Sequence, residues 1–211
     1  MSGLPDFFDM VTPGGTAHYV RQDYTPPAFR VYGQRDPRWA NEVYAGGSTF
    51  GAYGCLVCSV AMMVGIAYSE EILPPEVAAR LRDAGCFQGN LLSLPGRIPL
   101  AYERLTWDGV VHYRNVAADM NFVRQHVEDN GAVIAEVAFD PRFKVHWVDS
   151  DGVGHWNQHF VVITRVIGDD VEIADPWEGN LVMLTESRFF RYNWPKKASR
   201  VITGLRLVGV E

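Results

Sequence analysis

The sequence predicts an α+β fold in which helices come first and an antiparallel sheet follows. The segments with helical spacing all lie before about residue 131, and runs of β-branched residues with alternating polarity follow them. Helices and strands that are segregated along the chain in this way are typical of α+β proteins. We expect the helix at Cys55 to be buried against the C-terminal sheet.

Three segments have the pattern of helices. Residues 54–68, GCLVCSVAMMVGIAY, are apolar on nearly every side, which is typical of a helix that is buried all round. Residues 73–85 have prolines near the start and end at Gly85, and these residue types favour a helix start and a helix end. Residues 115–131 carry apolar side chains in helical register and stop at an Asn-Gly pair.

Five runs rich in β-branched residues predict the strands of the sheet. Apolar and polar residues alternate in them, and turn residues separate one run from the next. The runs are residues 132–139, 159–168, 170–176, 180–185 and 200–210. Gly168, Asp169 and Asp170 mark the boundary between the second and third runs, which predicts a β-hairpin there.

The chain divides into a short arm and one domain. Residues 1–29 contain several prolines and glycines and have no sustained periodicity, so we expect an extended arm. Apolar and aromatic residues are dense from residue 30 onward, and no linker interrupts them. The sequence therefore predicts a single domain over residues 30–211.

The composition of the chain restricts its partners and its location. With a formal net charge of −6 and no run of Lys or Arg, the chain offers little to neutralise phosphates, so we expect no nucleic-acid partner. No stretch approaches the roughly 20 apolar residues that cross a bilayer, so we expect no membrane insertion. The N-terminus lacks the pattern of a secretion signal, which indicates a cytoplasmic protein or one that is released without a signal peptide.

The chain has three cysteines, Cys55, Cys58 and Cys86. A small, odd number of cysteines does not form a disulfide framework, and it fits a reducing compartment or a catalytic thiol. Cys55 follows Gly54 at the start of a predicted helix, where free backbone amides and the helix dipole favour a thiolate. Cys58 lies nearly one turn further in, where apolar packing raises the pKa of a thiol. Cys55 is therefore the better nucleophile, and Cys58 and Cys86 are expected to be buried packing residues.

A histidine and an aspartate are predicted to meet at one edge of the sheet. His159 precedes the second strand and Asp175 closes the third, so a hairpin brings the start of one strand beside the end of the other. An imidazole held by a carboxylate can ionise a thiol. His155 is the alternative base, but it lies off the strand and is less firmly placed. Gln34 is a candidate donor to an oxyanion, together with the backbone N–H of Cys55.

Four motifs occur in the order QRDPRWA, STFGAYGCLVCSVAMMV, HFVVITRV and IADPWEG. Between about residues 30 and 210 they resemble the bacteriocin-processing (double-glycine peptidase-like) group of papain-fold cysteine peptidases, family thirty-nine of clan CA. The resemblance implies a papain-like fold in which Cys55 is the nucleophile, His159 the general base and acid, Asp175 its orienting carboxylate, and Gln34 the oxyanion donor. The group usually has threonine where this chain has Cys58, so the resemblance also implies a packing role for Cys58.

These observations predict a cysteine peptidase that hydrolyses a peptide or isopeptide bond of a peptide or protein substrate, without a cofactor. Members of the group that belong to exporters cut leader peptides after a double glycine, and no transporter segment is visible here. A leader peptide is therefore one candidate substrate, and a cell-wall peptide in a bacterial or phage setting is another.

Three other functions stay open. A papain-fold protein could bind peptides without cutting them, although such a protein has no need of all four site residues. A thiol–disulfide oxidoreductase that uses Cys55 and Cys58 requires a strand directly before the helix, where this sequence is loop-like. A metal site is the third alternative, but its spacing fits no strong ligand pattern, so we expect no metal. Its candidate ligands are His146, Asp149, Asp151, His155 and His159.

Overall fold

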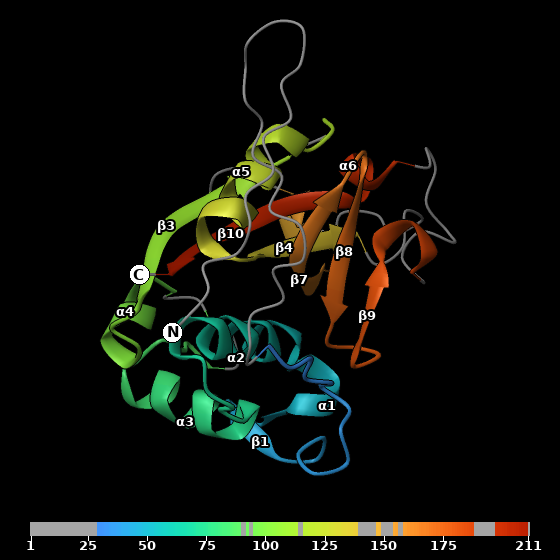
Figure 1. Cartoon of the computed structure of the whole chain (residues 1–211). Helices are drawn as coiled ribbons and strands as arrows, with labels where there is room; N and C mark the ends of the chain where they lie inside the picture. The colour runs from blue at the N-terminus through green and yellow to red at the C-terminus, as the bar shows by residue number, and fades with distance from the viewer. Residues whose placement is uncertain are drawn as a thin grey trace, which may run out of the picture.

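The computed structural model describes residues 29–89, 92, 95–113, 116–138, 147–148, 154–155, 158–187 and 197–210. Within these ranges the chain forms helices and a large antiparallel sheet, so the predicted α+β class is confirmed (Figure 1). The predicted arm, residues 1–29, lies outside the described residues except for Phe29.

Six strands form the main sheet, and every neighbouring pair is antiparallel. The order across the sheet is β3-β10-β4-β7-β8-β9, so the last strand of the chain lies between β3 and β4. The strands are β3 (Leu105–His112), β4 (Val133–Ala138), β7 (Gln158–Ile167), β8 (Asp170–Asp175), β9 (Asn180–Met183) and β10 (Ile202–Val210). All five predicted strands are present, and β7 and β8 form the predicted hairpin.

Strand β3 contradicts the expectation that all helices precede the sheet. It pairs with β10 but comes before the helix α5 (Met120–Asn130) in the chain. Most of its side chains are only half-buried or exposed, because it lies at the edge of the sheet. An edge strand needs no continuous apolar pattern, and in β3 the pair Asp108-Gly109 separates the apolar residues on either side of it. The sequence pattern therefore did not reveal it.

The remaining elements are short, except for two helices. The start of the last predicted strand, Arg200 and Val201, belongs instead to a short helix, and the predicted helix at 115–131 begins only at Met120. The remaining helices are α1 (Phe50–Tyr53), α2 (Cys55–Tyr68), α3 (Pro74–Asp83), α4 (Ile98–Ala101), α6 (Ala198–Val201), and the 3-10 turns η1 (Pro95–Arg97) and η2 (Leu184–Glu186). The remaining strands pair two by two: β1 (Val43–Ala45) with β2 (Ser48–Thr49), and β5 (Trp147–Val148) with β6 (Gly154–His155).

The sheet is covered on its two faces by different helices. On one face α2 packs against the sheet and α3 packs against α2, whereas α5 packs on the other face (Figure 1). The alternation of β4 shows the division: Ile134 belongs to the core beneath α2, and Val133 and Ala135 belong to the core beneath α5. Successive side chains of a strand point to opposite faces of the sheet, so alternate residues of β4 belong to different cores. The expected burial of the Cys55 helix against the sheet is confirmed.

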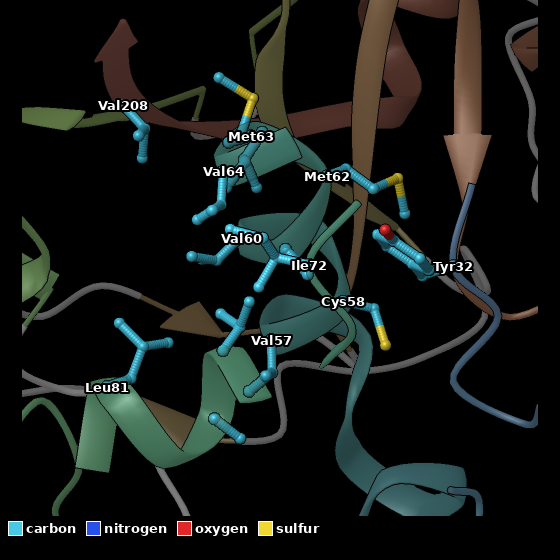
Figure 2. Packing of buried hydrophobic residues seen from close by; sticks show 14 of the residues in the cluster. Tyr32, Val57, Cys58, Val60, Met62, Met63, Val64, Ile72, Leu81 and Val208 are labelled. Atoms are coloured by element: carbon cyan, nitrogen blue, oxygen red, sulfur yellow. The ribbon is translucent and has the colours of Figure 1, made fainter. Parts of the chain in front are cut away.

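Helix α2 is the centre of the larger core. The side chains from Val57 to Ala67 are all buried, because neighbouring elements cover the helix on every side. Figure 2 shows Val57, Val60 and Leu81 of α3 on one side of the helix, and Cys58, Met62 and Tyr32 on another. This packing fixes the axis of α2, and with it the position of Cys55 at the helix start. No helix in the described ranges has the length and apolarity needed to span a bilayer.

Candidate active site

His159 and Asp175 meet at the edge of the sheet where β7 begins and β8 ends. The imidazole Nε2 of His159 is 2.6 Å from Oδ1 of Asp175, and both side chains are almost completely buried. The same Oδ1 accepts a hydrogen bond from the backbone N–H of Trp177 at 2.8 Å. The carboxylate is thus held in place by the backbone and fixes the orientation of the ring.

The β7–β8 hairpin brings these two residues together. Val162 pairs with Ala174, and the turn passes through Gly168 with a φ of 60°, which glycine adopts without strain. The second residue of β7 and the last residue of β8 therefore lie at the same end of the hairpin. The predicted strand run 159–168 begins at His159, which is the second residue of β7 in the structure.

Cys55 is the first residue of α2, and its partly exposed side chain hydrogen-bonds with His159. The one-turn helix α1 leads into α2, but the helical ladder is interrupted at Gly54. An N–H group at the first residue of a helix has no partner within that helix, so the Cys55 N–H can donate to a group bound next to the thiol. Glycine is needed at the interruption, because a Cβ on Gly54 would lie 2.7 Å from the carbonyl oxygen of Phe50.

The surroundings of Cys55 favour its thiolate. Burial raises the pKa of the thiol, but the hydrogen bond and the charge of His159 lower it, as do the backbone N–H groups of Phe160 and Leu56. The net result is a pKa below the ordinary value of a cysteine. Because Asp175 occupies Nε2 of the ring, Nδ1 is the nitrogen that remains for the thiol.

The imidazole is stabilised in its charged form. Burial lowers the pKa of His159, whereas the hydrogen bond to Asp175 and the hydrogen bond and charge of Cys55 raise it, and the resulting pKa is about 9. Between the lowered pKa of Cys55 and about 9, the pair is therefore a thiolate beside an imidazolium. This arrangement places a nucleophile and a proton donor next to each other in the same protonation state of the protein.

Cys58 has a different environment from Cys55, although the two are only three residues apart. Its side chain is completely buried, and it lies on the same side of α2 as Met62, the side that faces Tyr32 (Figure 2). Burial first, and then the charge of Cys55, raise the pKa of Cys58 well above its ordinary value. Cys86 is also completely buried, and burial raises its pKa. The predicted burial of Cys58 and Cys86 is confirmed.

Gln34 lies beside the start of α2 and is buried. Its backbone N–H donates to the carbonyl of Pro176 at 2.6 Å, just after the carboxylate of Asp175. Its side-chain Nε2 donates to the carbonyl of Gly51 at 3.1 Å, in the turn of helix that leads to Cys55. A carboxamide nitrogen carries two hydrogens, and the second has no partner among the described residues, so it can serve an oxyanion.

Two glycines that carried no sequence prediction hold the Gln34 segment against the sheet. A Cβ on Gly33 would lie 3.3 Å from Cα of Gly179, and a Cβ on Gly179 would lie 3.2 Å from Cα of Gly33. The two backbones therefore touch, and Gly179 also has a φ of 69°. Trp39 strengthens the same segment, since its buried indole N–H donates to the carbonyl of Gly33 at 2.9 Å.

Trp177 covers the imidazole, a role that the sequence interpretation missed. Its ring meets the His159 ring edge to face, with centroids 6.2 Å apart and an interplanar angle of 89°. On the indole lies the guanidinium of Arg35, whose Cζ is 3.4 Å from the ring centroid. The signal was present in the motif IADPWEG, in which Trp177 follows Asp175 by two residues, but only the aspartate was assigned a function.

The alternative base and the alternative metal site fall largely outside the described residues. His146, Asp149 and Asp151 lie outside them, and for His155 only the backbone is described, in β6. Among the residues that are described, no group of three or more His, Cys, Asp or Glu side chains could hold a metal ion. Of the two candidate histidines, His159 is thus the one that the structure shows in contact with a thiol and a carboxylate.

No family model, no curated protein and no solved structure matches the chain. The resemblance of its motifs to papain-fold peptidases therefore stays a prediction. What the chain does is inferred from its own site: a low-pKa thiol, an imidazole that contacts it, a buried carboxylate and a carboxamide.

Proposed function

We propose that the protein is a cysteine peptidase with a papain-like architecture, in which residues 30–211 form the catalytic domain. The observation that carries this proposal is the chain of contacts from Cys55 through His159 to Asp175. The three residues come from a helix and two strands, and the imidazole and the carboxylate are buried. A buried His–Asp pair that contacts a partly exposed, low-pKa thiol supports nucleophilic catalysis.

The first half of the reaction forms an acyl-enzyme. The Cys55 thiolate attacks the carbonyl carbon of an amide, and the carbonyl oxygen becomes an oxyanion as the sulfur–carbon bond forms. The Cys55 N–H and Nε2 of Gln34 donate hydrogen bonds to that oxyanion. The imidazolium of His159 then gives its proton to the leaving nitrogen, and the carbon–nitrogen bond breaks.

The second half of the reaction releases the acyl group. A water molecule attacks the thioester while His159, now neutral, takes its proton. The carbon–sulfur bond breaks, the acid product leaves, and the thiolate–imidazolium pair is restored. Asp175 keeps the ring in one orientation throughout and stabilises its charged form.

The geometry disfavours the two other functions that involve these residues. A disulfide oxidoreductase needs its second cysteine to be reachable, whereas Cys58 is completely buried and has a strongly raised pKa. A protein that only binds peptides has no use for a thiol whose pKa is lowered by a histidine. Hydrolysis through Cys55 therefore accounts for more of the site than either alternative.

The decisive experiment compares two cysteine variants of the intact protein. Activity is measured against a fluorogenic peptide library, leader-like peptides with a double glycine, and purified bacterial cell walls. We expect wild-type protein to cut at least one of these, and Cys55→Ala to lose turnover by about a thousandfold or more. Cys58→Thr is the matched control, because it changes the neighbouring thiol without touching the proposed nucleophile, and it should keep most of the activity. Loss of activity in Cys58→Thr together with survival in Cys55→Ala would overturn the assignment.

A further inference from the structure

A small pocket lies between α2 and the sheet, and its walls are apolar except for one side chain. Its volume is about 20 Å³, which admits a single small group such as the end of a side chain. The apolar walls include Leu56 and Val60 of α2, Ile98 of α4, Trp107 of β3, Ile134 of β4 and Val208 of β10. The exception is Arg206 of β10.

The pocket adjoins the proposed nucleophile. Leu56, which forms part of its wall, is the residue after Cys55. The guanidinium carbon of Arg206 lies 5.1 Å from the centre of the Phe160 ring, and the backbone of Phe160 hydrogen-bonds with the Cys55 thiol. A side chain that enters this pocket therefore belongs to a residue close to the bond that Cys55 attacks.

Only one of the two terminal nitrogens of Arg206 has a hydrogen-bond partner among the described residues. Its Nη2 donates to Oε2 of Glu136 at 3.0 Å, and both side chains are largely buried. The hydroxyl of Thr203 donates to Oε1 of the same carboxylate at 3.3 Å. Nη1 of Arg206, in contrast, is buried and has no hydrogen-bond partner among the described residues. A buried donor without an acceptor is costly, so an arriving acceptor gains a strong hydrogen bond.

We propose that this pocket is a specificity site for a neutral substrate side chain with an apolar stem and a terminal carbonyl oxygen, such as glutamine, and that Arg206 selects it. The proposal rests on the peptidase function and names the substrate class that the same site would prefer. The apolar walls contact the end of the stem, and Nη1 of Arg206 donates to the carbonyl oxygen. The methyl groups at the end of a leucine side chain fit the same walls but leave Nη1 without an acceptor.

The charge in the pocket favours a neutral group over an anion. Glu136 already balances the charge of Arg206 at 3.0 Å, so a substrate carboxylate would add a net negative charge to a mostly apolar space. A lysine would bring a second cation next to the guanidinium and offer no acceptor. Of side chains with comparable length, the carboxamide alone supplies an acceptor without a net charge.

The test measures how fast peptides that carry a thiol-reactive vinyl sulfone label Cys55 in the intact protein. Each of the two residues before the vinyl sulfone is varied among glutamine, leucine, glutamate and lysine, and labelling is followed by mass spectrometry. We expect glutamine at one of these positions to react at least about ten times faster than leucine, because the donor is charged. Glutamate and lysine should react more slowly than glutamine. In Arg206→Met the ratio of the glutamine to the leucine rate should fall to about one or below.

Two further variants keep the test informative. In Arg206→Met alone, the buried carboxylate of Glu136 loses its partner, and the protein can fail to fold. The double variant Glu136→Gln, Arg206→Met removes both buried charges, so the preference for glutamine can still be measured without Arg206. Arg165→Met is the matched control, because Arg165 pairs with Glu172 at 2.6 Å on β7 and β8 and does not line the pocket. It should keep the wild-type ratio.

Each of the remaining results overturns a defined statement. Equal rates for glutamine and leucine in wild type, a preference for glutamate, or a glutamine preference that survives both Arg206 variants would overturn the specificity site alone. If iodoacetamide labels Cys55 but none of the peptidyl reagents does, the proposed peptidase function fails as well.

Discussion

At the scale of single residues, two cysteines of one helix turn have opposite chemistry because of what surrounds their sulfur atoms. The Cys55 sulfur contacts an imidazole and two backbone N–H groups, whereas the Cys58 sulfur contacts the core. The sequence allowed this difference to be predicted, since a helix start and a helix interior differ in free amides. The raised pKa of His159, about 9, could not be predicted, because it requires the 2.6 Å contact with Asp175 and the hydrogen bond with Cys55 to outweigh the lowering effect of burial.

Asp175→Asn tests this coupling through the pH dependence of Cys55 alkylation. The carboxylate stabilises the imidazolium, and the imidazolium in turn stabilises the thiolate, so the pKa of Cys55 should rise when the charge of Asp175 is removed. We expect the pH at which iodoacetamide begins to label Cys55 to move upward by about one unit or more, toward that of an ordinary thiol. The pKa of His159 should fall at the same time, which narrows the range of the ion pair from both sides.

The control for this substitution is Glu76→Gln, which removes a surface carboxylate that pairs with Arg80 on α3 and is not among the groups that shift the pKa of Cys55. It should leave the onset of alkylation where it is in wild type. An unchanged onset in Asp175→Asn would show that the carboxylate does not act on the thiol through His159.

At the scale of elements, the site is assembled by one hairpin and one break in a helix. The turn residues Gly168, Asp169 and Asp170 and the two flanking β-branched runs predicted the hairpin, and with it the meeting of His159 and Asp175. The contact between Gly33 and Gly179 could not be predicted, since it joins two turns far apart in the chain. Strand β3 was missed for a related reason: an edge strand is stabilised by its pairing with β10 more than by its own pattern.

Gly179→Ala measures what the backbone contact contributes. The residue has a φ of 69°, so any side chain costs about 1–2 kcal/mol of strain, and the new Cβ would also lie 3.2 Å from Cα of Gly33. The clash should displace the Gln34 segment, so we expect a loss of peptidase activity in addition to a lower free energy of unfolding. Urea denaturation gives the second quantity and the peptide assay gives the first.

Gly168→Ala is the matched control for this prediction. Gly168 has a similar φ of 60°, but a Cβ there meets no atom within 4 Å. It should cost about the same backbone strain and leave the activity of the folded protein unchanged. Equal loss of activity in both variants would mean that the contact between the two glycines does not position Gln34.

At the scale of the whole molecule, the site is divided between two layers. Cys55 comes from helix α2 and Gln34 from the turn before the first elements, which hydrogen-bonds to Gly51 of α1, whereas His159 and Asp175 come from the sheet. The sequence predicted the helices and the sheet that form these layers. It did not predict that the last strand, β10, lies between β3 and β4. That insertion carries Arg206 to the floor of the pocket, so the pocket was beyond what sequence patterns alone could predict.

A site that is divided between two layers exists only while these layers are packed together, and the three cysteines report on that packing. In the folded protein Cys55 is partly exposed, whereas Cys58 and Cys86 are completely buried. We therefore expect a neutral thiol reagent at pH 7 to label Cys55 alone, because it is the one of the three thiols that is partly exposed. It should also react faster than a free thiol, because its lowered pKa makes a larger fraction of it thiolate. As urea is added, Cys55 should lose its excess reactivity over the same concentration range in which Cys58 and Cys86 become labelled, since one packed core between α2 and the sheet both protects these thiols and holds His159 against Cys55. Mass spectrometry of the labelled peptides follows each cysteine separately. Labelling of Cys58 before urea unfolds the chain would contradict the packing role of that residue, and loss of Cys55 reactivity well before Cys58 is exposed would show that the two layers separate before the core opens.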